Sequence, residues 1–241
     1  MSGYSGPRYI LSAIFQPIYQ FLYPAVCIVC DARLAESEDK ACSNCWGSIR
    51  TVSKEDALYR QQLARLTGGG SVISLVSAYH FERDGTLQTL VHGLKYNGMT
   101  KLGNELGRRL GTVAKGELEE MSVDGIIPVP LHPTKERERG YNQTMFIAEG
   151  LSEATGIPVL PGVLVRHKYT KSQTRLTSEE RHANVGGAFS VSPESVARLR
   201  GKVFVVLDDV LTTGATIEAC ATVLTANGAG RVVACAVALA E

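Results

Sequence analysis

The sequence has few aromatic residues and almost no net charge. Phe, Trp and Tyr make up 7% of the 241 residues, with a single Trp, and 25 Lys and Arg stand against 24 Asp and Glu. Stacking platforms for nucleic-acid bases are therefore scarce. The net charge of +1 provides no global attraction to a polyanion. A nucleic-acid partner would have to be bound by local patches of charge.

Long hydrophobic runs are also absent. The segment before Cys27 is rich in Ile, Leu, Phe and Tyr, but Gln16, Pro17 and Gln20 interrupt it. Its apolar run is well short of the roughly 20 residues that a membrane-spanning helix needs. No small-residue cleavage site precedes Cys27, so we expect no signal peptide. The sequence predicts a short amphipathic helix at residues 10–21, a cytoplasmic location and no membrane partner.

Apolar residues follow helix and strand periods, and no internal repeat or low-complexity segment is present. Helical spacing is found in four segments: 87–94, 102–113, 141–155 and 217–224. Five apolar segments are predicted to be strands: 72–81, 125–129, 163–165, 203–207 and 231–239. Strands that are apolar throughout and alternate with helices are typical of a mostly parallel sheet covered on both faces. The sequence therefore predicts an α/β fold.

A glycine-rich turn at residues 67–70 separates two regions of different composition. Before it lie four of the six cysteines and a polar helical stretch at 54–66, and after it the alternation of strands and helices begins. We predict an N-terminal module of residues 1–70, with a helix and a metal ribbon, and a second domain of residues 71–241. The remaining cysteines, at 220 and 235, fall in apolar segments, where we expect core residues.

Four cysteines form two pairs, each with two residues between its members: Cys27 with Cys30, and Cys42 with Cys45. This spacing lets one tight turn present two sulfurs to one ion, and four thiolates suit tetrahedral Zn²⁺. Because protein would fill all four positions, we predict a structural zinc rather than a catalytic one. Iron fits the same ligands, and unligated cysteines or two reversible disulfides remain alternatives.

The segment 203–217, VFVVLDDVLTTGATI, joins a buried strand to a helix through a polar turn. Asp208 and Asp209 follow the apolar run, and Gly214 lies where the helix begins. A helix start offers unpaired N–H groups, and glycine lets an anion approach the backbone closely. No lysine lies in the turn, so it is not a Walker loop. The pattern predicts a site for a phosphate with vicinal hydroxyls, such as a ribose 5-phosphate, and simple helix capping is the alternative.

Three blocks of this sequence together resemble the ComF/GntX-like family. LDDVLTTGAT (207–216) resembles a signature that binds phosphoribosyl pyrophosphate (PRPP). PVPLHPTKERERGYNQ (128–143) resembles the family's P-V-P-x-x-x-x-R-x-R-G-[FY]-N-Q block, and HGLKYNG (92–98) resembles its L-K-Y-x-G element. The four-cysteine ribbon belongs to the same pattern. Over most of the chain, the resemblance implies a type I phosphoribosyltransferase fold with a flexible hood and a zinc-binding N-terminal module.

The resemblance also implies roles for the acidic turn. Asp208 and Asp209 would hold the ribose hydroxyls of PRPP, directly or through Mg²⁺. The 5-phosphate would bind to the residues that follow them: Val210, Leu211, Thr212, Thr213, Gly214, Ala215 and Thr216. Transfer passes through an oxocarbenium-like ribosyl centre, so carboxylates favour the developing positive charge and cations neutralise the leaving pyrophosphate. No covalent protein nucleophile is required.

Cations for the phosphates are expected from two blocks. Lys95 resembles the residue of the family's pyrophosphate loop, with a solvated lysine at a helix end as the alternative. Arg137 and Arg139 resemble a second anion-binding cluster, with a wet surface as the alternative. We predict Asp208, Asp209, Lys95 and Arg139 to be catalytic, and Lys95 and Arg137 to bind phosphate.

A third basic segment, 166–181, resembles the family's Q-x-x-L-x-x-x-x-R-x-x-N element. The matching residues are Gln173, Leu176, Arg181 and Asn184. We expect this segment to close over the site and to exclude water, which protects an activated sugar from hydrolysis. A solvated surface loop is the alternative.

Two functions are compatible with these features. The first is an Mg²⁺-dependent phosphoribosyltransferase, or a PRPP-binding protein, whose acceptor the sequence does not identify. The family name reflects competence for DNA uptake, so the alternative is an accessory protein that binds single-stranded nucleic acid or proteins of the competence machinery. In that case the PRPP site would be regulatory or vestigial. The sequence leaves the oligomeric state open.

Overall fold

The computed structural model of the chain describes residues 24–167 and 187–241. Contacts divide the chain into two compact units, residues 1–49 and 50–241. The helix expected at 10–21 and most of the basic segment 166–181 lie outside the described residues. In the part of the chain that is described, no helix is both long and apolar enough to cross a membrane.

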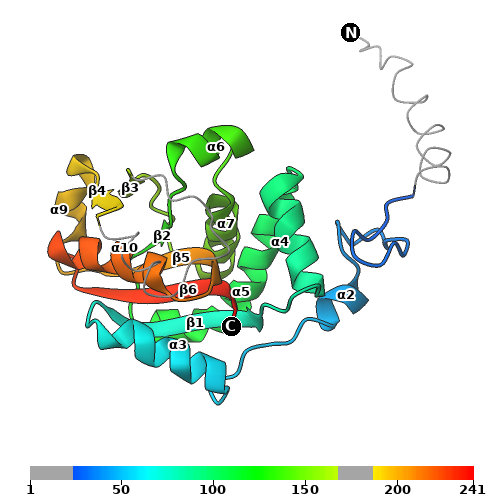
Figure 1. The fold of residues 1–241 in the computed structure, drawn as a ribbon, viewed down its shortest axis with the longest axis horizontal. Helices are drawn as coiled ribbons and strands as arrows, with labels where there is room; N and C mark the ends of the chain where they lie inside the picture. Colours follow the sequence, from blue (N-terminus) through cyan, green and yellow to red (C-terminus); the bar gives the residue numbers. More distant parts are fainter. Residues whose placement is uncertain (1–23, 168–186) are drawn as a thin grey trace, which may run out of the picture. The chain divides into compact units, whose positions relative to one another are not determined.

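A four-stranded parallel sheet forms the centre of the larger unit (Figure 1). Its strands, in chain order, are β1 (Val72–His80), β2 (Gly125–Pro128), β5 (Val203–Leu211) and β6 (Arg231–Leu239). Their order across the sheet is β1-β6-β5-β2, and each neighbouring pair is parallel. The apolar character of these strands follows from burial on both faces. The structure thus confirms the predicted mostly parallel sheet.

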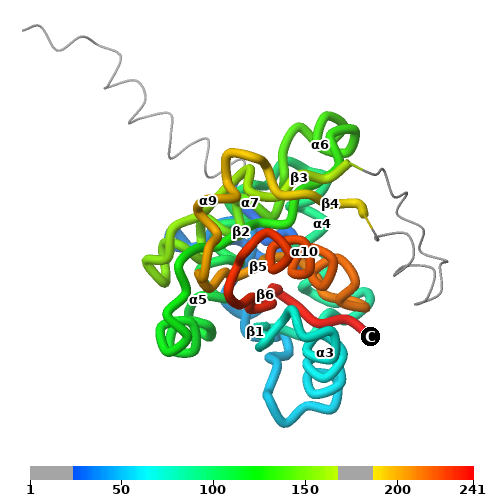
Figure 2. Tube along the Cα trace, turned by 90° about the vertical axis from the view of Figure 1, so that its left-hand side faces the viewer, coloured from blue at the N-terminus to red at the C-terminus, as the bar shows by residue number. Residues whose placement is uncertain are grey.

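Helices cover both faces of this sheet (Figure 2). On one face lie α5 (Thr100–Glu120) and α7 (Gln143–Thr155), and on the other lie α3 (Ala57–Gly68) and α10 (Ala215–Ala226). A further helix, α4 (Thr86–Tyr96), connects β1 to α5. The core under α3 and α10 is built from large apolar side chains: Leu66, Phe204, Ile217, Leu224 and Val232. Burial on both sides of the sheet supplies the main stabilisation of the unit.

Glycines allow α5 and α7 to approach one another closely. A Cβ atom on Gly107 would collide with the backbone of Ile147 and Leu151, and one on Gly150 would collide with the backbone of Asn104. Only residues without a side chain fit at this crossing, because neither backbone can give way cheaply. The contact fixes the position of α7 and therefore also that of Gln143, its first residue.

The sequence does not predict several short elements. These are β4 (Phe189–Val191), which pairs antiparallel with β3 (Leu164–Arg166), the 3₁₀ turn Pro193–Ser195, and the helices α2 (Ser43–Gly47), α6 (Pro133–Arg139) and α9 (Val196–Leu199). In α6 the sequence is PTKERER, without any apolar spacing. Proline at its start and Gly140 in the left-handed conformation after its end define it instead.

Strand β5 is longer than the sequence predicts, and this corrects the expected position of the two acids. Asp208 and Asp209 lie within the strand and not after it. Asp208 is paired with Ala236 of β6, and Val210 is paired with Ala238. The neighbouring strand therefore continues the hydrogen-bonded ladder past the end of the apolar run, which the prediction took as the strand's end.

The boundary between the two units falls between Ile49 and Arg50, before the glycine turn at which the sequence predicts it. Helix α3 belongs to the larger unit because Tyr59 and Leu66 are buried in the core beneath it. This packing could not be predicted from the mostly polar composition of the helix, because only one narrow face of the helix is apolar.

Candidate functional site

Cys27, Cys30, Cys42 and Cys45 come together in the smaller unit. Their four Sγ atoms all lie within 4.8 Å of one another, and the Cys27–Cys45 and Cys30–Cys42 sulfur pairs are each 3.7 Å apart. A tetrahedron with metal–sulfur bonds of about 2.3 Å has edges of about 3.8 Å, whereas a disulfide needs about 2.05 Å. The four cysteines could hold a metal such as zinc, and their spacing does not fit disulfides.

Backbone hydrogen bonds shape the first cysteine pair for this purpose. Asp31 N donates to Cys27 O at 2.9 Å, and Asp31 itself adopts φ = 58°, which closes the turn after Cys30. Cys42 N donates to the Cys27 sulfur at 3.4 Å. Burial raises the pKa of Cys27. The hydrogen bond from Cys42 N and further backbone hydrogen bonds outweigh burial and lower this pKa to about 6. These hydrogen bonds thus favour the thiolate of Cys27, which is the form that binds a metal.

A second group of polar side chains surrounds the end of β5. Asp209 is 5% exposed. Its Oδ2 atom lies 2.8 Å from Lys95 Nζ and accepts a hydrogen bond from Gln143 Nε2 at 2.9 Å. Its Oδ1 atom accepts from Val210 N at 2.7 Å. Burial would raise the pKa of Asp209, but the charge and hydrogen bond of Lys95 lower it below its ordinary value. This acid is therefore held ionised.

Asp208 has the opposite character. Burial, and after it the negative charge of Asp209, raise its pKa to about 7. The carboxylate is fixed locally because its Oδ1 accepts a hydrogen bond from Asp209 N at 2.9 Å. The pKa values of these two adjacent acids are thus shifted in opposite directions, and that of Asp208 lies near neutral pH.

Arg139 joins this group from the end of α6. Its Nη1 donates to Gln143 Oε1, and its guanidinium lies 5.3 Å from the ring centre of Tyr96, which follows Lys95 in the chain. Arg137 is different. It is exposed, and its side chain makes no hydrogen bond or ion pair within residues 24–167 and 187–241. The structure therefore brings Asp208, Asp209, Lys95 and Arg139 together, and within the described residues no hydrogen bond or ion pair joins Arg137 to them.

The loop after the two acids leads directly into α10. Gly214 has φ = 78° and stands at the N-cap of the helix, where it offers no side chain to the first N–H groups. A Cβ atom on Gly214 would lie 2.8 Å from Leu66 Cδ2. Glycine is thus required both by the left-handed backbone and by the close packing on α3. The free N–H groups at this helix start can bind an anion.

Comparison with known proteins gives relatives of two names. The chain is 29% identical over 202 residues to "Competence protein F" of Haemophilus influenzae, covering 80% of this chain and 87% of that protein. It is 30% identical over 149 residues to "DNA utilization protein YhgH" of Salmonella typhimurium, covering 61% of this chain and 64% of that protein. The chain is thus similar to ComF-type proteins. No protein-family model matches it.

Two solved structures also match part of this ComF-like chain. One is the glutamine PRPP amidotransferase of B. subtilis complexed with ADP and GMP, with 25% identity and a TM-score of 0.35, covering 55% of this chain and 25% of that one. The other is described as the allosteric regulatory enzyme of purine biosynthesis, with 22% identity and a TM-score of 0.38, covering 60% and 29%. The ComF-like chain spans less than a third of either structure.

Two further cations of the ComF-like site were not assigned from the sequence. Burial lowers the pKa of Lys135, and the positive charges of Arg166, Arg139 and Lys95 lower it further. Burial also lowers the pKa of Arg166, against the charge of Asp208, which raises it. Lys135 is thus electrostatically linked to the other cations, and Arg166 to Asp208. The signal for Lys135 was its position in the same basic run as Arg139.

A buried glutamine, Gln62, donates hydrogen bonds to the loop that follows β5. Gln62 of α3 is 3% exposed, and its Nε2 donates to Thr212 O and, at 3.5 Å, to Ala240 O. Sequence reasoning missed Gln62 because a single glutamine in a polar helix carries no pattern. Only the fold brings it to the loop.

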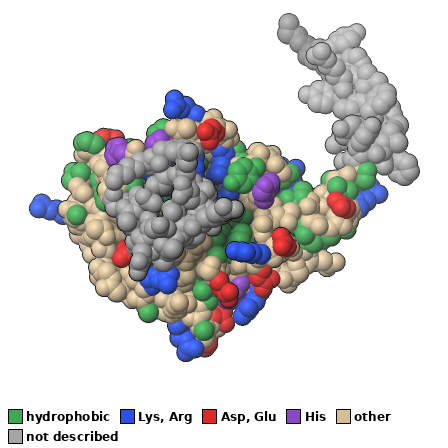
Figure 3. Space-filling model, in the orientation of Figure 1, with side chains coloured by type: hydrophobic (Ala, Val, Ile, Leu, Met, Phe, Trp, Pro, Cys, Tyr) green, Lys and Arg blue, Asp and Glu red, His purple; other side chains and the backbone are tan. Residues whose placement is uncertain are grey.

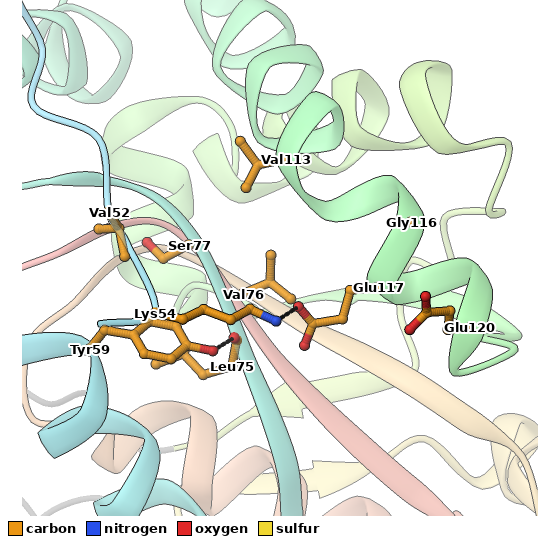
Figure 4. A pocket seen from close by; sticks show the side chains of 10 residues that line it. All are labelled: Val52, Lys54, Tyr59, Leu75, Val76, Ser77, Val113, Gly116, Glu117 and Glu120. Carbon is orange, nitrogen blue, oxygen red and sulfur yellow. Dashed lines mark hydrogen bonds and ion pairs between the residues drawn. The ribbon is translucent and has the colours of Figure 1, made fainter. Parts of the chain in front are cut away.

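A separate hollow of about 350 Å³ opens beside β1, which is two strands away from β5 (Figure 4). Lys54 reaches across it to Glu117, with 2.7 Å between Nζ and Oε2. Tyr59 donates its hydroxyl hydrogen bond to Leu75 O at 2.7 Å in the same region. Neither acid at the end of β5 lines this hollow. The hydrogen bond from Tyr59 to Leu75 O joins α3 to β1 beside it.

Proposed function

We propose that this ComF-like protein binds PRPP together with Mg²⁺ and acts as a phosphoribosyltransferase, in which an acceptor displaces pyrophosphate. One observation carries the proposal. An ionised, lysine-paired acid near the end of β5 is followed, after a short loop, by the start of α10, whose N-cap residue Gly214 has no side chain to cap the first N–H groups. A site for a simple anion would not contain two carboxylates, whereas a ligand with both phosphate and sugar hydroxyls needs both kinds of group.

The parts of PRPP correspond to different parts of the site. The ribose hydroxyls would bind at Asp208 and Asp209, and the 5-phosphate at the loop 210–216. The pyrophosphate would face Lys95 and Arg139. Lys135 adds positive charge near Lys95 and Arg139. The site would therefore offer negative charge to the ribose and positive charge to the pyrophosphate.

In the proposed reaction, negative charge moves from the ribose to the leaving pyrophosphate. As the bond from ribose C1 to pyrophosphate breaks, positive charge develops on the ring and negative charge on pyrophosphate. Asp209 is held ionised and favours the first, and the cations favour the second. The two acids offer oxygen ligands that would hold Mg²⁺ with the ribose hydroxyls, and the ion would supply further neutralisation of the pyrophosphate.

Titration calorimetry with PRPP and Mg²⁺ tests the proposal. We expect binding by the wild-type chain and at least tenfold weaker binding by Asp208→Asn and Asp209→Asn. The control is Asp84→Asn, which is exposed and has φ = 56°, a conformation that Asn also tolerates. No binding by the wild type, or equal binding by all three variants, would contradict the proposal. A screen of nucleobases and amines for pyrophosphate release then identifies the acceptor.

We also infer that the four cysteines hold Zn²⁺ in a structural role. Four thiolates leave no position open for a substrate, and the smaller unit has little apolar area with which to fold alone. Zinc is the commoner metal for such a site, although iron fits the same ligands. A cytoplasmic location is consistent with reduced cysteines.

Nucleic-acid binding is the second candidate, and the names of the relatives favour it. Against it, aromatic residues are few, and on the visible face of the described chain lysine and arginine are interspersed with acids (Figure 3). Binding of single-stranded DNA with a steep salt dependence would support this function. In that case neutralising Arg166, Lys168 and Lys171 should abolish binding, while Asp208→Asn should leave it unchanged. Binding of competence-machinery proteins would instead be lost when Cys27→Ser disrupts the metal module.

A further inference from the structure

Gln62 makes hydrogen bonds of one kind only. Its Nε2 atom donates to the carbonyl oxygens of Thr212 and Ala240, which follow two different strands of the sheet. Because both neighbours are acceptors, only the amide nitrogen can face them. Ala240 N in turn donates to Leu211 O at 2.8 Å. The start of the loop is therefore tied to the end of β6 and to α3 at the same point.

This tie fixes the direction of one peptide group. In a trans peptide the C=O and N–H bonds point to opposite sides, and no described peptide bond is cis. When Gln62 holds the carbonyl of Thr212 toward α3, the N–H of Thr213 must point away from α3. If that peptide group turned over, a carbonyl oxygen would replace an N–H in the loop and would repel an anion.

The helix that carries Gln62 is itself fixed in place. Tyr59, one turn earlier, donates to Leu75 O of β1 (Figure 4), and Leu66, one turn later, packs beneath Gly214. The three side chains lie on one face of α3 at spacings of three and four residues. Gln62 therefore has a rigid support on both sides.

We propose that Gln62 is a positioning residue, which orients the Thr212–Thr213 peptide so that the loop presents the Thr213 N–H to a phosphate group. The inference rests on the proposed PRPP function and deepens it. Gln62 touches no substrate and acts only through the backbone of the loop.

Stability alone does not explain a glutamine here. Its Oε1 atom is buried and has no hydrogen-bond partner among the described residues. A buried acceptor without a partner is unfavourable, and methionine would fill the same volume without one. Gln62→Met should consequently leave the thermal midpoint close to that of wild type, while it frees the Thr212 carbonyl.

The matched pair for the test is Gln62→Met and Gln61→Met, since Gln61 is the exposed neighbour on the same helix. Calorimetry with PRPP and Mg²⁺ should give about tenfold to hundredfold weaker binding for Gln62→Met and unchanged binding for Gln61→Met. That range corresponds to the loss of one hydrogen bond to a charged group. Equal affinities in both variants would overturn the inference and leave the proposed function standing. Absence of binding by the wild type would overturn both.

Backbone amide NMR separates positioning from general damage. In the wild type, PRPP should shift the Thr213 and Thr216 amide signals. In Gln62→Met the response of Thr213 should be lost, and that of Thr216, at the helix start, should persist. A variant that loses both responses together with its thermal midpoint would show a structural role only, and this would overturn the inference.

Discussion

Lys95 Nζ lies 2.8 Å from Asp209 Oδ2 and so joins the last turn of α4 to the end of strand β5. The lysine side chain is 23% exposed and that of the acid 7%. An ionised carboxylate at this depth needs a partner, because removing one member of a buried pair leaves an uncompensated charge. The pair therefore has a structural consequence as well as the proposed role in binding.

Lys95→Met should lower the free energy of unfolding at pH 7 by about 2 kcal/mol. The folded pKa of Asp209 lies below its ordinary 3.8, so this stabilisation is present above about pH 4 and is lost as the pH falls through the folded pKa. Urea unfolding at pH 7 measures the effect. Lys115→Met, whose lysine side chain is 55% exposed, is the control. Equal midpoints for the two variants would contradict the expected dependence of Asp209 on Lys95.

Asp208 should make stability fall as the pH rises toward neutrality. Its folded pKa of about 7 exceeds the ordinary 3.8, so the folded state keeps a proton that the unfolded state loses between these values. The free energy of unfolding decreases over that window. Asp208→Asn removes this dependence and should be more stable than wild type at pH 8 by on the order of 2 kcal/mol, with no gain at pH 4. If the free energies of unfolding of wild type and Asp208→Asn differed by the same amount at every pH, the result would be inconsistent with a raised pKa of Asp208.

Two glycines of α5 should respond oppositely to the same substitution. Gly107→Ala places a methyl group against the backbone of Ile147 and should destabilise the protein by about 3 kcal/mol. A Cβ atom on Gly116 meets nothing within 4 Å, so Gly116→Ala should stabilise by about 0.5–1 kcal/mol through helix propensity. Thermal unfolding of both variants gives the comparison. A gain in stability for Gly107→Ala would mean that the two helices do not pack as closely as described.

The purified chain should contain one metal ion, and removing it should unfold the smaller unit alone. Cys27→Ser should lose the metal because three thiolates and a hydroxyl bind zinc far more weakly. Elemental mass spectrometry distinguishes zinc from iron, and proteolysis reports unfolding of residues 24–49. Cys220→Ala, which changes a buried cysteine of α10, should keep the metal. Full metal content in Cys27→Ser would exclude this cysteine as a ligand.

Periodic apolar segments made most of the larger unit predictable from the sequence. The runs at 203–207 and 231–239 gave two strands that the structure confirms, because a strand buried on both faces admits little besides apolar residues. Helix α6 was missed because its contacts are polar and local. The end of β5 was misjudged because pairing with β6, and not the run's own composition, determines where the strand ends.

The candidate site was predictable only in part, for a related reason. Asp208, Asp209 and Gly214 belong to one contiguous segment, and a contiguous segment can be recognised by its order of residue types. Lys95 and Arg139 come from other helices, and the resemblance of their blocks was needed to connect them with the acids. Gln62 belongs to no such block, and its role depends on a contact across 150 residues of sequence. Interactions of this kind follow from the fold alone.

The position of β6 between β1 and β5 has a consequence for how the chain folds during its synthesis. Strand β1 emerges from the ribosome early, but its partner in the sheet is residues 231–239, and these also form one flank of β5. No adjacent pair that includes β1 can form until β6 has been translated. Until then the apolar edges of β1 and β5 stay exposed, and such edges are prone to aggregation. A nascent chain of this protein is therefore expected to depend on chaperones until β6 has been released.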